Sequence, residues 1–141
     1  CSNLAKQIVV DGEGAKKFVT VKILNAKSAM SAKKIAHSIA NSPLIKTAIA
    51  GEDPNWGRVI MGIGKSGEKI DSDKLVIKLG EFIVAEKGKI SETYDEENLK
   101  EYMKWDSILI EINLNQGNDT FICYTCDFTH DYIDINADYR N

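Results

Sequence analysis

A strict alternation of apolar and polar residues over 107–115 constrains the fold of this chain more than any other sequence feature. Four large aliphatic side chains recur at every second position of this run: Ile108, Ile110, Ile112 and Leu114. Successive side chains of a strand point to opposite faces of a sheet, so this spacing predicts a strand with one buried face. The polar, glycine-containing residues 115–119 are typical of a turn, and 120–126 again favours a strand. The pattern therefore predicts a β-hairpin.

Shorter alternating runs at 17–24, 74–79 and 81–85 predict three further strands. In the first of them, three branched aliphatic side chains share one face: Val19, Val21 and Ile23. Gly80 separates the other two runs, and a glycine inside a strand pattern predicts a bulge or a bend. The second half of the chain is therefore expected to be richer in strands.

Residues 28–41 form the clearest predicted helix, because isoleucine and alanine recur at helical spacing along one face. Ser28 or Ser31 can cap its N-terminus, since a serine hydroxyl accepts a hydrogen bond from a backbone N–H of the first turn. Pro43 is expected to end it, because the residue before a proline is pushed out of the helical region. The stretch that follows, 44–50, shows no clear period.

Two more helices are predicted further along the chain. Asp53 before Pro54 is typical of an N-cap followed by the first helical residue. This helix is expected to bury Val59, Ile60 and Ile63. Residues 93–96, Thr-Tyr-Asp-Glu, fit a capping box that opens a helix reaching about Lys104. Its inward side chains are expected to be Leu99, Tyr102 and Met103. A short helix is also predicted over 1–10.

The chain has 141 residues, 43% of them hydrophobic, with no internal repeat and no low-complexity linker. A chain of this length buries roughly 68% of its extended surface, which supports one core. We therefore expect residues 1–141 to form a single α+β domain with a mainly antiparallel sheet packed by about three to four helices. Three cysteines cannot all pair, which excludes a disulfide-built scaffold. No apolar run approaches the roughly 20 residues that cross a bilayer, so a membrane is not an expected partner.

Acidic residues concentrate at the C-terminal end. The net charge is −3, from 18 basic and 21 acidic residues, and the segment 127–141 holds four aspartates against Arg140 alone. The rest of the chain is neutral and lacks the basic surplus typical of phosphate binding, so nucleic acid is not an expected partner. Three aromatic residues lie in the same acidic segment: Phe128, Tyr132 and Tyr139. A tail this aromatic is expected to pack against the protein or a ligand.

Two glycine-containing motifs are candidates for chemistry. The motif Asp-Gly-Glu-Gly at 11–14 places Glu13 between glycines, where its carboxylate could approach a ligand and bind an ammonium group or act as acid or base. A plain turn with a solvated glutamate explains the same pattern. The motif Glu-Asp-Pro-Asn-Trp-Gly-Arg at 52–58 favours a helix start that Asp53 caps and Trp56 anchors by packing over a catalytic role.

Cys123 and Cys126, with His130 close by, suggest a metal or redox site. Strand positions three apart point to opposite faces, and no second cysteine pair completes four ligands, so buried or half-buried thiols are the better interpretation. Cys1 could act as an N-terminal nucleophile, but nothing identifies a base for it. The missing initiator Met instead suggests a processed chain or a fragment of a longer protein.

Four blocks of motifs follow one another along the chain, at 4–15, 39–48, 51–58 and 126–140. They contain D-G-E-G, A-N-S-P-L, G-E-D-P-N-W-G-R and C-D-F-T-H-D-Y followed by I-N-A-D-Y-R. Together they closely resemble the ornithine acetyltransferase family, the glutamate N-acetyltransferases of arginine biosynthesis. The resemblance spans the whole chain and matches the C-terminal part of the β chain of these enzymes. It implies a DmpA/ArgJ-like fold.

The resemblance implies a threonine-nucleophile acyltransferase, made as a precursor that cuts itself before that threonine into α and β chains. The threonine takes the acetyl group from N2-acetyl-L-ornithine, releases ornithine and passes the acetyl group to L-glutamate. Some members also accept acetyl-CoA. The resemblance further implies an α/β heterotetramer in which the α chain of the same precursor is the partner, no cofactor, and a cytoplasmic location.

Matched motif by motif, the resemblance makes Glu13, Asn136 and Asn141 the expected substrate-binding residues. Position 141 is usually threonine in the family, and asparagine keeps a hydrogen-bonding side chain but loses the hydroxyl. The family's nucleophile lies in an Ala-Thr-Met-Leu-like block that does not occur here, and its oxyanion-hole residues belong to the α chain. We therefore expect this chain to contain no catalytic residue and no metal site, and to be inactive alone. Two other functions stay open: a non-catalytic assembly or binding domain of the α/β complex, and a metal or redox module on Cys123 and Cys126.

Overall fold

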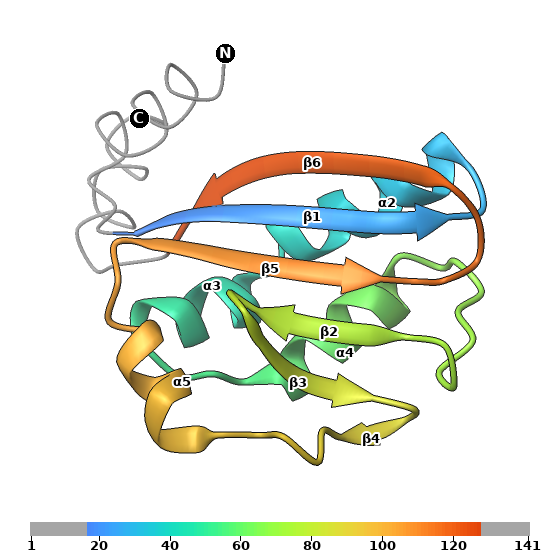
Figure 1. Ribbon diagram of the computed structural model, residues 1–141. Coiled ribbons are helices and arrows are strands. Elements are labelled where there is room, and N and C mark those ends of the chain that lie inside the picture. Colours follow the sequence, from blue (N-terminus) through green and yellow to red (C-terminus); the bar gives the residue numbers. More distant parts are fainter. Residues whose placement is uncertain (1–16, 128–141) are drawn as a thin grey trace, which may run out of the picture.

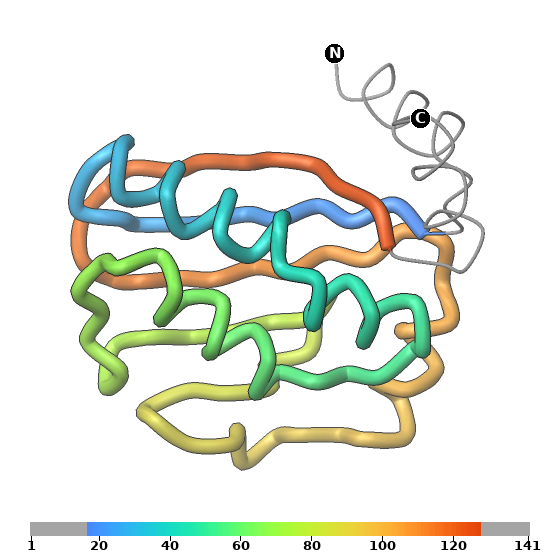
Figure 2. Tube along the Cα trace, turned by 180° about the vertical axis from the view of Figure 1, so that it is seen from behind, coloured from blue at the N-terminus to red at the C-terminus, as the bar shows by residue number. Residues whose placement is uncertain are grey.

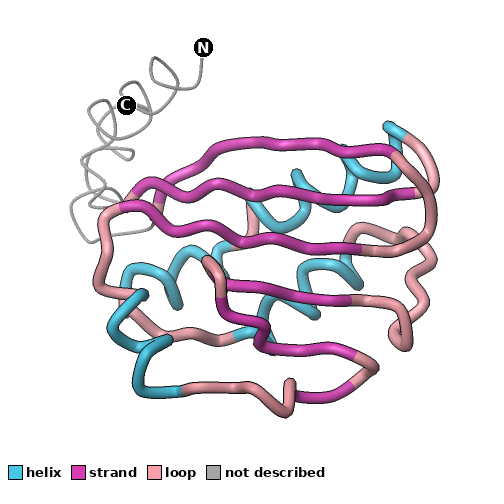
Figure 3. The backbone as a smooth tube through the Cα atoms, in the orientation of Figure 1, coloured by secondary structure: helices cyan, strands magenta, loops and turns pink. Residues whose placement is uncertain are grey.

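The structure is a computed structural model that describes residues 17–127. In chain order its elements are β1 (Phe18–Ala26), α2 (Ala29–Ala40), α3 (Pro43–Ala50), α4 (Trp56–Lys65), β2 (Val76–Leu79), β3 (Phe82–Glu86), β4 (Lys89–Ile90), α5 (Glu96–Tyr102), β5 (Ser107–Asn113) and β6 (Asp119–Cys126). The strands form one sheet, and α2, α3 and α4 cover one of its faces (Figures 1 and 2). Within the described range, the opposite face carries no helix (Figure 3). The predicted α+β class is confirmed.

The strand order across the sheet is β4-β3-β2-β5-β1-β6, and all neighbouring pairs are antiparallel except β1 and β5, which run parallel. The predicted predominance of antiparallel pairing is therefore confirmed. The predicted hairpin of 107–115 with 120–126 is wrong. Both strands form, but β1 lies between them, so that Val21 pairs with Ile110 on one side and with Cys123 on the other.

The turn after β5 explains this difference, because it passes over the end of β1 instead of folding back tightly. The Gln116 backbone N–H donates to the Asn25 carbonyl oxygen at 2.8 Å. Gly117 approaches β1 so closely that a Cβ there would clash with the Ala26 carbonyl oxygen. Alternation fixes the face that a side chain takes, but it does not fix which strand lies beside it.

The alternating strand residues form the core as predicted. The four aliphatic residues of the 107–115 run are at most 1% exposed: Ile108, Ile110, Ile112 and Leu114. They join one hydrophobic cluster with the stripe of β1 and with the inner faces of the helices. Each such buried side chain contributes about 1.5–3 kcal/mol relative to an exposed one. None of the helices within 17–127 is long and apolar enough to span a membrane.

α2 occupies the predicted position, and Ser28 is its cap because the Ser28 Oγ accepts the Ser31 backbone N–H at 3.0 Å. α3 was not predicted from the sequence, because 44–50 shows no clear period. Pro43 ends α2 but is also the first residue of α3, and the Ser42 Oγ accepts the Ile45 N–H at 3.3 Å. Proline fits the first turn because its missing N–H would have no helical partner there.

α4 begins later than predicted. Asn55 rather than Asp53 is its cap, since the Asn55 Oδ1 accepts the Arg58 N–H at 3.2 Å. Two of its three predicted core residues are buried, whereas Ile60 is 40% exposed. The cap of α5 is likewise Asp95 rather than Thr93. Its predicted inward residues are all buried: Leu99, Tyr102 and Met103.

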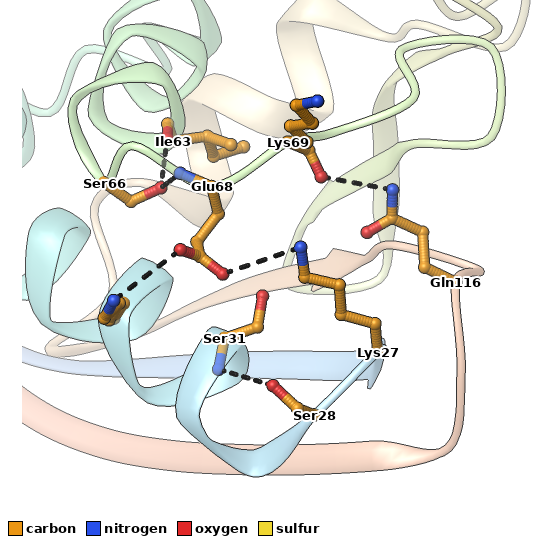
Figure 4. Close-up of polar contacts among 9 residues, drawn as sticks. Lys27, Ser28, Ser31, Ile63, Ser66, Glu68, Lys69 and Gln116 are labelled. Carbon is orange, nitrogen blue, oxygen red and sulfur yellow. Dashed lines mark hydrogen bonds and ion pairs between the residues drawn. The ribbon is translucent and has the colours of Figure 1, made fainter.

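A polar network closes the end of the sheet at which β1 finishes (Figure 4). The Glu68 carboxylate lies 4.0 Å from the Lys27 Nζ and 3.9 Å from the Lys34 Nζ. The Gln116 Nε2 donates to the Lys69 carbonyl oxygen at 3.3 Å. These contacts tie the segment after α4 to α2 and to the turn before β6. The other end of the sheet is therefore the one where the described chain begins and finishes.

Candidate functional site

The start of β1 and the end of β6 lie side by side (Figure 1), and this pairing brings together Lys17 and Asp127, the first and last described residues. The Lys17 backbone N–H donates to the Asp127 Oδ1 at 2.9 Å, and the Asp127 backbone N–H donates to the Lys17 carbonyl oxygen at 3.3 Å. The predicted site residues Glu13, Asn136 and Asn141 lie outside the described residues. In the sequence, Glu13 lies four residues before Lys17, and Asn136 and Asn141 lie 9 and 14 residues after Asp127.

The Lys17 side chain is buried and has two partners. Its Nζ donates to the Trp105 carbonyl oxygen at 2.9 Å and forms an ion pair with the Glu52 Oε2 at 3.1 Å. Lys17 as a whole is only 5% exposed. A buried ammonium group is tolerated only where acceptors replace its water. We call this group of four residues, Lys17, Glu52, Trp105 and Asp127, the Lys17 junction.

Glu52, the first residue of the 52–58 motif, contacts Lys17 in the junction. It follows α3 with a φ of 58°, a left-handed conformation that is uncommon for a residue other than glycine. Its backbone N–H donates to the Ile49 carbonyl oxygen at 3.0 Å, and its side chain is 43% exposed. The carboxylate therefore has one oxygen on Lys17 and is partly exposed at the end of the sheet where Lys17 and Asp127 lie.

The remaining residues of this motif mostly hold the loop together. The Asn55 Nδ2 donates to the Asp53 Oδ2 at 3.3 Å, and the Arg58 Nη1 donates to the Leu44 carbonyl oxygen at 2.8 Å. The Asp53 carboxylate also affects Tyr94, whose pKa is raised by burial and by the nearby Glu96 and Asp53 charges. The interpretation of 52–58 as a helix start is correct, and Trp56 packs against the core as predicted, but Asn55 rather than Asp53 is the cap. Glu52 has an additional contact that the sequence did not indicate.

A hollow of about 480 Å³ lies beside the junction, between α5 and the β2–β3 turn. Phe82, Tyr102 and Trp105 contribute aromatic walls, and Glu81 and Glu101 contribute carboxylates. The Tyr102 hydroxyl accepts the Leu109 backbone N–H at 2.8 Å. Burial raises the pKa of Tyr102, and the Leu109 hydrogen bond partly opposes that shift. Trp105 connects the two features, since its ring lines the hollow and its carbonyl oxygen accepts from Lys17.

The predicted half-buried or buried thiols are confirmed, since Cys123 is half-buried and Cys126 is buried. Cys123 and Cys126 are both thiols, and the Cys123 Sγ donates to the Ala36 carbonyl oxygen of α2 at 3.7 Å. Burial raises the pKa of Cys123 to about 11, which disfavours the thiolate that binds metals and reacts with disulfides. Across residues 17–127, no three His, Cys, Asp or Glu side chains are grouped so that they could hold a metal ion. His130 lies outside the described residues.

Comparisons with known proteins agree with the resemblance in the motifs. The model of the ArgJ family matches residues 1–141. The arginine biosynthesis bifunctional protein ArgJ of Ruegeria pomeroyi is 53% identical over 139 residues, and that of Brucella melitensis is 52% identical over 139 residues. Each alignment covers 99% of this chain but only 34% of the relative. The chain thus spans about a third of the length of these curated relatives.

A solved structure gives the same result for the fold. The crystal structure of the arginine biosynthesis bifunctional protein argJ from Bacillus halodurans superposes with a TM-score of 0.89 at 40% sequence identity. The superposition covers 99% of this chain and 65% of that chain. Because a family model matches the entire sequence and the fold is shared, this chain belongs to the ArgJ family.

Proposed function

We propose that this chain is the C-terminal domain of the β chain of an acetyltransferase that moves acetyl from N2-acetyl-L-ornithine to L-glutamate in arginine biosynthesis. The pairing of Lys17 with Asp127 is the observation that carries the proposal. In the sequence, Lys17 lies four residues after Glu13, and Asp127 lies nine residues before Asn136. The two predicted binding segments are therefore attached to neighbouring residues, which supports their contribution to one site.

The chemistry of these side chains fits amino-acid substrates. Ornithine has ammonium groups, and a carboxylate such as that of Glu13 forms charge-assisted hydrogen bonds with them. Asn136 and Asn141 offer amide donors and acceptors to the carboxylate or acetyl group. The nucleophile in this proposal is a threonine outside the 141 residues, with its α-amino group as base and an oxyanion hole from the α chain. No side chain of this chain then forms the acyl intermediate.

The lengths of the relatives support a two-chain enzyme. This chain covers 65% of the solved chain from Bacillus halodurans but 34% of the curated relatives, so that solved chain is roughly half as long as the curated sequences. A precursor cut once near its middle gives chains of that length. We therefore include the α chain in the proposal as the partner, in an α/β heterotetramer located in the cytoplasm. Because some members of the family accept acetyl-CoA, kinetics with acetyl-CoA in place of acetylornithine test whether it is a second acetyl donor.

Kinetics of the full-length precursor test this proposal. With acetylornithine and glutamate as substrates, Glu13→Ala is expected to lower kcat/KM by about 10-fold to 100-fold, the range for a hydrogen bond to a charged group. Glu97→Ala, which removes an exposed carboxylate on α5, is the matched control and should leave the kinetics unchanged. Unchanged turnover and KM for Glu13→Ala contradict the site assignment, and absence of acetyl transfer by the wild-type precursor contradicts the function.

One structural feature favours a second function, a non-catalytic assembly domain of the α/β complex. The sheet face without helices carries apolar side chains between its charged ones, and Ile122 there is 43% exposed. Such a face is suited to pack against another layer. Under this alternative, Glu13→Ala leaves kinetics unchanged, whereas Ile122→Asp prevents the α and β chains from purifying together.

A further inference from the structure

We propose that the hollow beside the Lys17 junction is a binding site for an organic cation with an alkylammonium or alkylguanidinium group. The hollow lies between α5 and the β2–β3 turn, and every residue that lines it is described by the structure. It contains none of the predicted substrate-binding residues, so this inference goes beyond the proposed function. Its volume of about 480 Å³ falls in the range of roughly 300–1,000 Å³ that is typical of small-molecule sites.

Aromatic rings form one wall of the hollow. The ring centroids of Tyr102 and Trp105 are 5.0 Å apart with their planes at 56°, and those of Phe82 and Tyr102 are 6.1 Å apart with their planes at 54°. Tyr102 is buried, whereas Trp105 is 62% exposed. The face of an aromatic ring carries partial negative charge, and tryptophan attracts a cation more strongly than tyrosine or phenylalanine does. An accessible tryptophan ring in a hollow is therefore suited to hold a cation.

Hydrogen bonds hold this aromatic wall in place without a ligand. The Trp105 backbone N–H donates to the Tyr102 carbonyl oxygen at 2.9 Å, and the Trp105 carbonyl oxygen accepts from the Lys17 Nζ at 2.9 Å. The Tyr102 hydroxyl accepts the Leu109 backbone N–H at 2.8 Å, and Gly80 lies directly against the Tyr102 ring. A preformed site loses little conformational freedom on binding, which favours affinity.

The charge of the lining favours a cation over an anion. Two lining residues are acidic, Glu81 and Glu101, and none is basic. Glu81 forms no ion pair with any residue of 17–127. Glu101 pairs with Lys104 at 3.1 Å, but both side chains are mostly exposed, and a surface pair of this kind is weak enough for a ligand to replace. The segment 91–106, which includes α5, has six acidic residues against two lysines, so its field attracts cations.

The combination of rings and carboxylates defines the class of cation. A metal ion needs several grouped ligands, and no three His, Cys, Asp or Glu side chains in the part of the chain that the structure describes are grouped in that way. An alkylammonium or alkylguanidinium uses both features, because its charge pairs with the carboxylates and its carbon chain covers the rings. A free amino acid also brings a carboxylate, which this acidic lining disfavours. The site is therefore expected to prefer cations without a carboxylate.

Titration of the full-length precursor with butylammonium and with methylguanidinium, followed by NMR of the ligand, tests the proposal. We expect saturable binding of both cations, and weaker binding of butanol, which has the butyl chain without the charge. Trp105→Leu keeps an apolar side chain but removes the ring, so it should weaken binding of the cations about fivefold or more. Glu81→Gln keeps the shape of the side chain and removes its charge, so it should weaken binding about twofold to fivefold.

Glu97→Gln is the matched control, because Glu97 is an exposed carboxylate of α5 that does not line the hollow. It should leave the affinity unchanged, as should Glu13→Ala, which alters the proposed substrate site. Melting temperatures are measured for every variant, and titrations are run well below the lowest of them. Equal affinity of the wild type and Trp105→Leu overturns the proposal. An equal loss for Glu81→Gln and Glu97→Gln also overturns it, because the effect would then follow net charge alone.

The same titrations with the 141-residue chain show whether a free cation or a side chain of the precursor occupies the hollow. Binding by both proteins, with the same dependence on Trp105, supports the proposal. If the 141-residue chain binds the probes and the precursor does not, a lysine or arginine of the precursor fills the hollow, and the site for a free cation is wrong. Absence of acetyl transfer by the wild-type precursor contradicts the proposed function alone, because these titrations do not involve that reaction.

Discussion

Two serines at the start of α2 lie three residues apart and differ in what their hydroxyls contact. The Ser28 Oγ accepts the Ser31 backbone N–H at 3.0 Å and so caps the helix. The Ser31 Oγ is buried and has no hydrogen-bond partner among residues 17–127. The same side-chain chemistry therefore stabilises the fold at one position and opposes burial at the other.

Alanine substitutions should separate these two effects. Ser28→Ala is expected to reduce the free energy of unfolding by about 1 kcal/mol, the usual contribution of an N-cap. Ser31→Ala removes a buried hydroxyl that lacks a partner, so it should be neutral or stabilising. Urea denaturation of the 141-residue chain measures both. A larger loss for Ser31→Ala than for Ser28→Ala would contradict these roles.

Cys123 is expected to make stability depend on pH in the alkaline range. Burial raises the pKa of its thiol from 9.0 to about 11, so the folded chain holds the thiol proton more tightly than the unfolded chain. The resulting stabilisation is complete below about pH 9 and is lost as the pH rises toward about 11. Urea midpoints across this range should fall more steeply for the wild type than for Cys123→Ala. The raised pKa values of Tyr94 and Tyr102 act in the same direction and remain in the variant, so equal slopes would show that Cys123 contributes nothing.

At the scale of elements, the sequence predicted where each strand lies in the chain better than it predicted which strands pair with one another. Alternation placed the buried faces of β1 and β5 correctly, because burial of one face follows directly from a period of two. It could not show that β1 separates β5 from β6, since that depends on the Gln116 turn crossing the end of β1. α3 was not predicted because it has only eight residues and because Pro43, which ends α2, is also its first residue.

The β2–β3 turn requires glycine at position 80, whereas the sequence predicted only a bulge or a bend there. Gly80 has a φ of 62°, and a Cβ there would lie 2.6 Å from the Tyr102 Cζ. Gly80→Ala is therefore expected to destabilise the chain by more than about 1 kcal/mol. Gly64→Ala in α4 is the matched control, because a Cβ there meets nothing within 4 Å and alanine favours a helix by up to about 1 kcal/mol. Urea denaturation should give opposite signs for the two variants, and a neutral Gly80→Ala would be inconsistent with this turn.

At the scale of the whole molecule, the motifs identified the family, and the structure adds contacts of two motif residues, Glu52 and Asp127, with Lys17, which lies outside the motifs. Glu13, Asn136 and Asn141 came from the sequence blocks and stay predictions, because they lie outside residues 17–127. The Lys17–Glu52 pair could not be predicted, since 35 positions separate the two residues and α2 and α3 lie between them. Alternation alone also gave no reason to expect that a lysine at the start of a strand is buried.

The central position of β1 has a consequence for how the chain folds during synthesis. Phe18 pairs with Ser107 on one side and with Cys126 on the other. β1 therefore cannot pair with its neighbours until β5 and β6 have been synthesised. At ribosomal speeds of about 5–20 residues per second, both edges of β1 stay unpaired for on the order of 5–20 s. The β2–β3 hairpin closes locally in this interval, whereas β1 depends on contacts distant in the chain and is slow to join the sheet. The nascent chain thus presents an apolar strand without neighbours, which makes β1 the segment that a ribosome-associated chaperone has most reason to shield.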